Sequence, residues 1–166
     1  MSDTVKQQVT ALFNQYLAAF HGYDLAGVST CYHLPCTLNT PDKIVLLTNQ
    51  GEFNREFSEI FAQLKQANTS TIVANKASFT QLNEQLLLAC IDWDFVDENQ
   101  QVFADFSAFY HITITETDSN DATKQELKII NVVSHELTNA ISLTHSFSVD
   151  DTRKNSASMK FKRELK

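Results

Sequence analysis

The chain has 166 residues, enough for one domain with a substantial core, and it contains 12 phenylalanines but only three glycines and two prolines. Its formal net charge of −7 argues against nucleic acid or an anionic membrane as a partner of the domain body. Residues 153–166 hold six basic residues and one acidic residue, which leaves a net charge of −12 on residues 1–152. We predict one domain over residues 1–147 and a basic, partly disordered tail over residues 148–166. That tail either stays solvated or folds back onto the acidic body.

The cysteine count indicates a reducing compartment. Cys31, Cys36 and Cys90 are an odd number at uneven spacing, and the N-terminal segment lacks the apolar run of a signal peptide. The longest apolar stretch is well short of the roughly 18 residues of a membrane span. We expect a soluble cytoplasmic protein with reduced thiols.

The first third of the chain predicts helices and a short hairpin. Apolar residues recur every three or four positions from Val5 to Phe20, which is typical of an amphipathic helix, and Gly22 should end it. Asp24 can cap a second, short helix that runs to about Ser29. Two prolines then bracket an extended segment, and we expect residues 36–40 and 43–48 to pair as strands.

A third helix should follow the hairpin. Asn49 and Glu52 have capping-box spacing, and apolar residues again follow a helical stripe from Phe53 to Leu64. We expect this helix to end near Asn68. From Ser70 to Glu136 the pattern changes to alternation with period two, which predicts four long strands, over residues 71–81, 85–96, 102–115 and 126–136. The fold class is therefore α+β, a curved antiparallel sheet of about six strands wrapped on the N-terminal helices, with a pocket between them.

The two faces of the central strands differ in composition. On the strands near Trp93 and Phe106 one face is entirely apolar and should pack on the helices. The opposite face still carries large apolar side chains, at Leu86, Leu88, Phe103 and Phe109. We predict that a second copy of the chain covers this outer face in a homodimer.

Short motifs add a family resemblance over residues 5–136. They are the segments 16–20 (YLAAF), 21–27 (HGYDLAG), 35–41, 91–93 (IDW) and 106–110 (FSAFY). In these motifs and in its order of elements the chain resembles the nuclear transport factor 2-like superfamily, which includes ketosteroid isomerases and SnoaL-type polyketide cyclases. The resemblance implies a cone-shaped roll with cystatin-like topology.

The resemblance also implies positions for catalytic groups. In ketosteroid isomerases a tyrosine on the first helix donates to the oxyanion, a carboxylate before a proline moves the proton, and a protonated aspartate is the second donor. Tyr16 falls at the position of the tyrosine. Thr40, immediately before Pro41, falls at that of the base, and the aspartate position falls near Ala108. Since a threonine hydroxyl cannot act as a base at ordinary pH, the isomerase activity does not carry over.

The candidate ligand-binding residues come from the helix stripe and the inward strand faces. Tyr16, Trp93, Phe106 and Tyr110 either line a pocket or fill it as core residues. On the last strand the more apolar alternation, Leu127, Ile129, Asn131, Val133 and His135, is the one expected to face inward. It would bring Asn131 and His135 to the pocket, where His135 would be the best available general base. A structural role at the sheet edge is the alternative for that histidine.

Two functional hypotheses follow. The first is a small-molecule-binding or scaffold protein with an apolar pocket and no complete catalytic set. The alternative is a SnoaL-like isomerase, cyclase or dehydratase that acts on a small apolar carbonyl compound with Tyr16 and His135. No cofactor is predicted, and no metal site, because Cys31, His33 and Cys36 lack a fourth ligand nearby in sequence.

Overall fold

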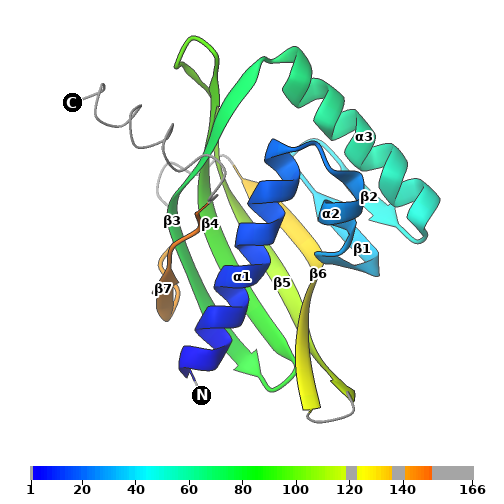
Figure 1. Ribbon diagram of the computed structural model, residues 1–166, viewed down its shortest axis with the longest axis vertical. Helices are drawn as coiled ribbons and strands as arrows, with labels where there is room; N and C mark the ends of the chain where they lie inside the picture. The colour runs from blue at the N-terminus through cyan, green and yellow to red at the C-terminus, as the bar shows by residue number, and fades with distance from the viewer. Residues whose placement is uncertain (1, 119–122, 136–140, 151–166) are drawn as a thin grey trace.

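The computed structural model describes residues 2–118, 123–135 and 141–150. Figure 1 shows a long first helix lying against the concave face of a strongly curved sheet, with the third helix beside one end of it. The elements are α1 (Ser2–His21), α2 (Leu25–Ser29), β1 (Tyr32–Asn39), β2 (Ile44–Leu47), α3 (Gln50–Gln66), β3 (Thr69–Asn83), β4 (Leu86–Asp97), β5 (Val102–Asp118), β6 (Thr123–His135) and β7 (His145–Phe147). The predicted α+β class is confirmed, as is the wrapping of a curved sheet on N-terminal helices.

The sheet differs from the predicted one in two respects. Within the described residues it has seven strands in the order β2-β1-β6-β5-β4-β3-β7, and β1 pairs with β6 in parallel while the other pairs are antiparallel. Alternation along the chain predicts a meander of neighbouring strands. It contains no information about a pairing between strands about 90 residues apart, so the sheet is mixed rather than purely antiparallel.

The end of α1 is fixed by Tyr23 rather than by the predicted Gly22. The helix stops at His21, and Tyr23 adopts the left-handed conformation with a φ of 51°. The Tyr23 N–H donates to the Phe20 carbonyl at 3.2 Å, and the Asp24 N–H donates to the Ala19 carbonyl at 2.9 Å, which is the Schellman pattern of a helix C-terminus. The Tyr23 ring thereby reaches α3, where the Lys65 ammonium lies 4.8 Å from its centroid.

The predicted cap of α3 is present in a modified form. Asn49 Oδ1 accepts from the Glu52 N–H at 2.9 Å, as expected. Glu52 Oε1 in turn accepts from the N–H and the hydroxyl of Thr48, at 2.8 and 2.6 Å. These hydrogen bonds lower the pKa of the Glu52 carboxyl group. The cap therefore also fixes the chain that enters the helix.

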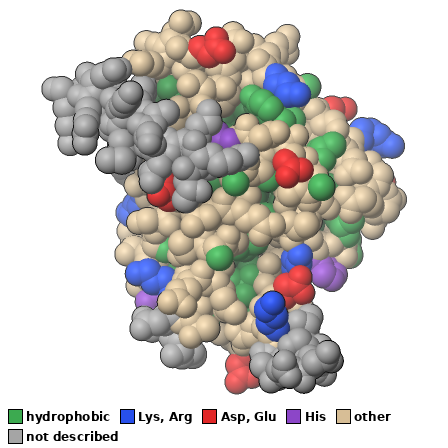
Figure 2. Space-filling model, viewed as in Figure 1, with side chains coloured by type: hydrophobic (Ala, Val, Ile, Leu, Met, Phe, Trp, Pro, Cys, Tyr) green, Lys and Arg blue, Asp and Glu red, His purple; other side chains and the backbone are tan. Residues whose placement is uncertain are grey.

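The core lies between the helices and the concave face of the sheet. Phe53, Phe57 and Phe61 project from α3 at helical spacing and are almost fully buried, and their rings contact Phe20 of α1 and Tyr32 of β1. On the face seen in Figure 2, exposed hydrophobic side chains form only scattered patches. None of the described helices is long and apolar enough to cross a membrane.

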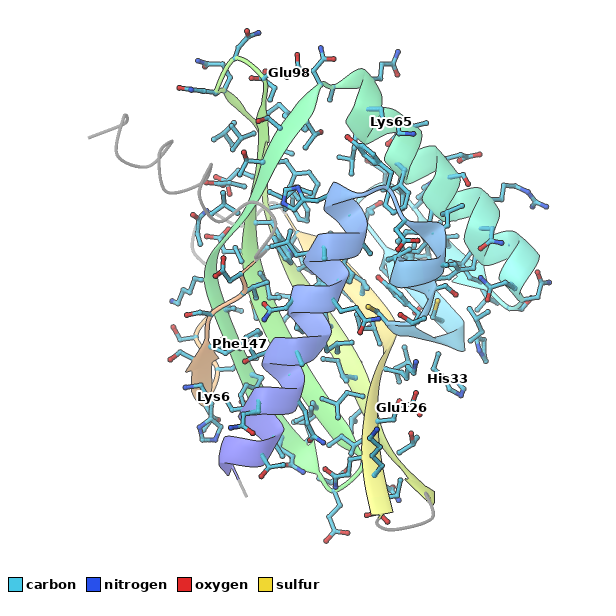
Figure 3. The ribbon with its side chains drawn as sticks, in the orientation of Figure 1. Lys6, His33, Lys65, Glu98, Glu126 and Phe147 are labelled. Carbon is cyan, nitrogen blue, oxygen red and sulfur yellow. The ribbon has the colours of Figure 1, made fainter. Side chains whose placement is uncertain are left out.

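The chain end adds an edge strand to this core. β7 pairs with β3, and Phe147 packs against Phe13 and Phe79 (Figure 3). The Asp150 N–H donates to Asn14 Oδ1 at 2.8 Å, so the described chain ends against α1. The predicted tail beyond Asp150 lies outside the described residues.

Candidate functional site

A cavity of about 290 Å³ lies between the concave face of the sheet, α1, α3 and the β1–β2 hairpin. Its walls are mostly aromatic and aliphatic. The contributing side chains include Tyr16 and Phe20 of α1, Tyr32 and Leu38 of β1, Phe57 and Ile60 of α3, Trp93 and Phe95 of β4, Phe106, Ala108 and Tyr110 of β5, and Val132 and Ser134 of β6. The volume is at the lower end of the range for small-molecule sites, which are typically concave and predominantly apolar.

Four aromatic polar side chains form a connected series at this cavity. Trp93 Nε1 donates to Tyr110 Oη at 2.8 Å, and the two residues are 2% and 1% exposed. The Tyr110 hydroxyl makes a hydrogen-bonding contact with that of Tyr16, and Tyr16 makes one with Tyr32. The Tyr16 ring also stacks on Trp93 with centroids 6.1 Å apart. Since an indole N–H can only donate, the Tyr110 oxygen is the acceptor of this first hydrogen bond, and its O–H stays available to donate to Tyr16.

Burial keeps these tyrosines protonated. It is the largest cause that raises the pKa values of Tyr16, Tyr32 and Tyr110 well above the ordinary value of tyrosine, and the negative charge that would develop on a neighbouring phenol adds to it. Tyr16 is partly accessible because it borders the cavity. At physiological pH the three phenols are neutral hydrogen-bonding groups rather than bases.

The polar groups at the cavity come largely from α3 and the β1–β2 hairpin. Lys43 Nζ lies 3.6 Å from Glu56 Oε2, and Glu59, Gln63 and Asn39 also contribute to the lining. The Lys43 side chain is 59% exposed, whereas that of Glu56 is 16% exposed. This side of the cavity is therefore charged, in contrast to the aromatic wall formed by α1 and the sheet.

Four of the six predicted site residues lie together. Tyr16, Trp93, Phe106 and Tyr110 all border the cavity. Asn131 and His135 do not, and their expected inward orientation is wrong. His111 pairs with Asn131 but Ile112 pairs with Ile129, so Ile130 is an extra residue in β6. Such a bulge shifts the alternation by one, and Val132 and Ser134 face the cavity instead.

On the outer face both residues have other neighbours. Asn131 Oδ1 accepts from Thr37 Oγ1 at 2.6 Å and from Asn39 Nδ2 at 2.7 Å, and Asn131 Nδ2 lies 2.9 Å from His111 Nδ1. His135 is exposed and lies opposite Ser107, with its ring 6.2 Å from that of Phe109. Asn131 thus joins β1, β5 and β6, and the suggested pairing of Tyr16 with His135 does not occur.

Sequence reasoning missed Tyr32, which contributes the last hydroxyl of the series. The first strand was expected to begin at Cys36, after Pro35, but it begins at Tyr32. The available signal was local, because Tyr32 and Leu34 are apolar at alternate positions directly before the proline. Reading the strand through Pro35 would have placed a third tyrosine beside Tyr16 and Tyr110.

The two positions that the resemblance marked as catalytic also border the cavity. Thr40 and Ala108 occupy them, and neither supplies a carboxylate. The Thr40 hydroxyl accepts from the N–H groups of Asp42 and Lys43 at 3.3 and 3.2 Å, so it stabilises the β1–β2 turn. The cavity therefore lacks both carboxylic acids that the resemblance would place there.

The three cysteines are free thiols, they are buried, and burial raises their pKa values. Burial raises the pKa of Cys31 to about 12 and that of Cys36 to about 11, so both thiols are protonated at physiological pH. His33 between them is exposed. Among the described residues, His, Cys, Asp and Glu side chains form no group of three or more that could hold a metal ion.

Comparison with known proteins places this geometry in a family. None of the curated proteins matches the chain. A domain of unknown function with a cystatin-like fold from Nostoc punctiforme superposes with a TM-score of 0.60 and 13% identity, over 96% of this chain and 87% of that one. An NTF2-like protein from Novosphingobium aromaticivorans superposes with a TM-score of 0.61 and 8% identity, over 80% of this chain and 82% of that one.

A ketosteroid isomerase-like protein from Erwinia carotovora atroseptica gives a TM-score of 0.57 and 12% identity, over 81% of this chain and 97% of that one. At such identities these structures show a shared fold only. The family model described as NTF2-like protein (DUF6841) matches residues 6–136, from the first turns of α1 through the whole of β6. The chain therefore belongs to this NTF2-like family.

Proposed function

We propose that the protein binds a small, largely apolar molecule that carries one hydrogen-bond acceptor, such as a ketone or a phenolic oxygen. The observation that carries this proposal is the series of aromatic donors, from Trp93 to Tyr32, on the apolar wall of the cavity, opposite its charged side. Shape and polarity therefore agree with binding sites in which a few placed polar groups orient an apolar ligand.

The order of donors supports this choice of ligand. The Trp93 N–H donates a hydrogen bond to the Tyr110 hydroxyl, which can donate to that of Tyr16, and the Tyr16 hydroxyl can donate to that of Tyr32. The Tyr32 O–H then remains free to donate a hydrogen bond to an acceptor atom of a ligand in the cavity. Because the phenols stay protonated, a neutral or anionic acceptor fits this position better than a second donor.

A catalytic role has weaker support. An isomerase, cyclase or dehydratase needs a base beside the ligand, and His135 lies on the opposite face of the sheet. The glutamates at the cavity, Glu56 and Glu59, belong to α3, across from the sheet strands that carry Trp93 and Tyr110. We therefore place binding ahead of catalysis, with no cofactor and no metal in the proposal.

The test is a ligand screen with paired compounds and matched variants. Small aromatic or alicyclic ketones and phenols are screened against the full chain by native mass spectrometry, each beside the hydrocarbon that lacks the oxygen. Tyr32→Phe should weaken binding of the oxygenated compound by about 0.5–1.5 kcal/mol, the contribution of one hydrogen bond. It should leave binding of the hydrocarbon unchanged.

Ala108→Leu provides the control for location. Ala108 is 1% exposed and borders the cavity, so three added carbons must project into the ligand space. Binding of both members of a pair should then be lost. If Ala108→Leu binds as the wild type does, the ligand is elsewhere and the proposal fails.

A further inference from the structure

Strand β6 is longer than the strand that flanks it. β1 pairs with β6 only from Tyr32, opposite Ile129, to Asn39, opposite Val133. On its other side β6 pairs with β5 from Thr123 onward. Residues 123–128 therefore have a strand neighbour on one side only among the described residues. In Figure 1 this part of β6 continues past β1, toward the N-terminal half of α1.

The direction of the backbone groups on this segment follows from its hydrogen bonds. The Ile129 N–H points to the side of β1, because it donates to the Cys31 carbonyl at 2.8 Å. The carbonyls of Lys128 and Glu126 face β5, where each accepts at 3.3 Å from a threonine hydroxyl, Thr113 and Thr115 respectively. The backbone N–H and C=O groups of even-numbered residues in this segment thus point toward β5.

The backbone N–H and C=O groups of Gln125 and Leu127 must then point away from β5, to the side that has no strand among the described residues. Backbone N–H and C=O groups of successive residues point to alternate sides of a strand, so those of Gln125 and Leu127 share the side of Ile129. There β1 has not yet begun. An unpaired edge of this kind is a template for a further extended chain.

A groove of about 490 Å³ runs along this edge, between β6 and α1. Three carboxamides line it, from Gln8, Gln15 and Gln125, together with the apolar Ala11 and Leu12. Gln8 Oε1 is buried and has no hydrogen-bond partner among the described residues. A carboxamide offers the same donor and acceptor types as a peptide bond, and a buried acceptor without a donor is unfavourable until one arrives.

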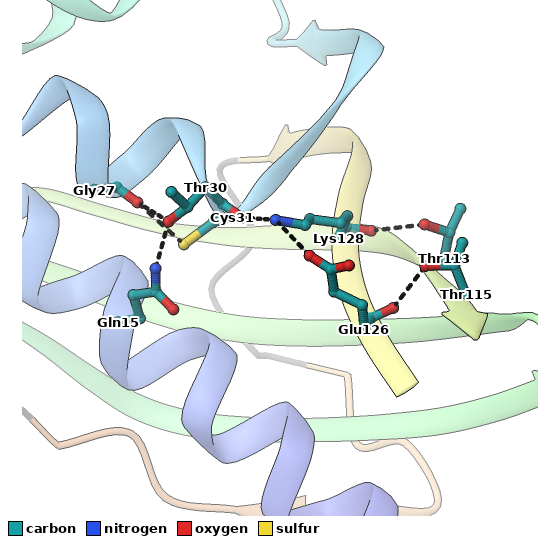
Figure 4. A network of polar contacts seen from close by, with 8 residues as sticks. All are labelled: Gln15, Gly27, Thr30, Cys31, Thr113, Thr115, Glu126 and Lys128. Carbon is teal, nitrogen blue, oxygen red and sulfur yellow. Dashed lines mark hydrogen bonds and ion pairs between the residues drawn. The ribbon is translucent and has the colours of Figure 1, made fainter. Parts of the chain in front are cut away.

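One of the two lysines of this segment, Lys128, is held at the junction between α2 and β1. Figure 4 shows Lys128 Nζ donating to the Thr30 carbonyl and paired with Glu126 Oε1, which lies 3.2 Å away. Gln15 Nε2 donates to Thr30 Oγ1, which donates to the Gly27 carbonyl at 2.7 Å. A lysine commonly protects a free edge from pairing. The charge of Lys128, however, is compensated by Glu126, and its position is fixed by the Thr30 carbonyl.

We propose that this groove is a docking site for an extended peptide segment of a partner protein, which adds as a strand to residues 123–128 of β6. An extended chain is the occupant because the open groups of Gln125 and Leu127 repeat at about 7 Å, the two-residue spacing of a strand. The net charge of −12 on residues 1–152 favours a neutral or basic peptide over an acidic one. Alternate side chains of that peptide lie against α1.

The experiment is a selection of random octapeptides displayed on phage against the full chain. Counter-selection uses Gln125→Pro, which removes one N–H from the open edge, where proline is tolerated. Selected peptides should bind Gln125→Pro at least tenfold more weakly than the wild type and bind Gln125→Ala, which keeps the N–H, within about threefold. Bound peptide should slow amide exchange at Gln125 and Leu127.

Two further readouts keep the test decisive if Gln125→Pro folds poorly. Two methylated versions of a selected peptide are compared, one N-methylated at its odd-numbered residues and one at its even-numbered residues. Only the version whose methyl groups face β6 should lose binding to the wild type. Gln8→Met should weaken peptide binding about fivefold while raising the melting temperature, a combination that a purely structural glutamine would not produce. Recovery of no peptide, equal binding to Gln125→Pro, or self-association that this variant abolishes would each overturn the proposal.

Discussion

Replacing Tyr110 by phenylalanine should lower the free energy of unfolding by about 1–3 kcal/mol, the cost of leaving a buried polar group without a partner. Trp93 Nε1 donates to the Tyr110 hydroxyl at 2.8 Å, and both side chains are at most 2% exposed. The phenylalanine ring would keep the packing and remove the hydroxyl, which accepts from Trp93 and also contacts the hydroxyl of Tyr16. A result near 1 kcal/mol would mean that water from the adjoining cavity reaches the indole N–H.

The chain offers a direct assay. Trp93 is the only tryptophan of the 166 residues, so its fluorescence reports both unfolding in urea and the polarity around the indole. For a chain of this size each kcal/mol corresponds to about 2–4 °C in melting temperature, so the loss should be about 2–12 °C. Tyr23→Phe removes a hydroxyl from a partly exposed ring, and it should change stability by less than about 0.5 kcal/mol.

A double-mutant cycle tests the reasoning itself. If the hydrogen bond carries the effect, Trp93→Phe combined with Tyr110→Phe should cost less than the sum of the single changes, measured by circular dichroism. Additive costs, or a loss below about 0.5 kcal/mol in Tyr110→Phe alone, would refute the account of the buried pair.

Tyr16→Phe should weaken an oxygen-bearing ligand less than Tyr32→Phe does in calorimetry, because the Tyr16 hydroxyl directs its hydrogen bond to Tyr32 rather than to the ligand. It should also reduce stability, because the Tyr16 hydroxyl contacts those of two other tyrosines. We propose that the outer face forms a homodimer, and Phe109→Asp should then shift light scattering toward the 18.8 kDa monomer; a monomeric wild type at micromolar concentration would exclude it. Burial, and then the charge of Asp105, raises the pKa of Asp92, so its ionised form is disfavoured in the folded state. The stability loss therefore develops as the pH rises above about 3.9, and Asp92→Asn should stabilise by less than about 1 kcal/mol at pH 7 and not at pH 3, in urea denaturation. Asn49→Ala should cost about 1 kcal/mol in the same assay, because it removes the acceptor for the Glu52 N–H.

Periodicity correctly placed Tyr16, Trp93 and Tyr110 at the cavity, because these residues lie on regular elements. Tyr16 belongs to the helical stripe of α1, and Trp93 and Tyr110 belong to strands β4 and β5, whose pairing is regular from Leu86 to Phe95. In such elements the position of one buried residue fixes the orientation of the others. Tyr32 lies outside the predicted strand for a related reason: Pro35 predicts a strand start, whereas β1 runs on both sides of the proline.

The placement of His135 required information that alternation cannot hold. One extra residue, Ile130, separates the half of β6 in which Leu127 and Ile129 face α1 from the half in which Val132 and Ser134 face the cavity. Both halves obey period two, but they are out of phase by one position, so a single pattern drawn through the strand is correct for one half and inverted in the other. The same bulge lies beside the irregular stretch of β1 between Tyr32 and Thr37. A function assigned from the unbroken pattern would have supplied a general base, and the bulge is the physical reason that the cavity has donors but lacks that histidine.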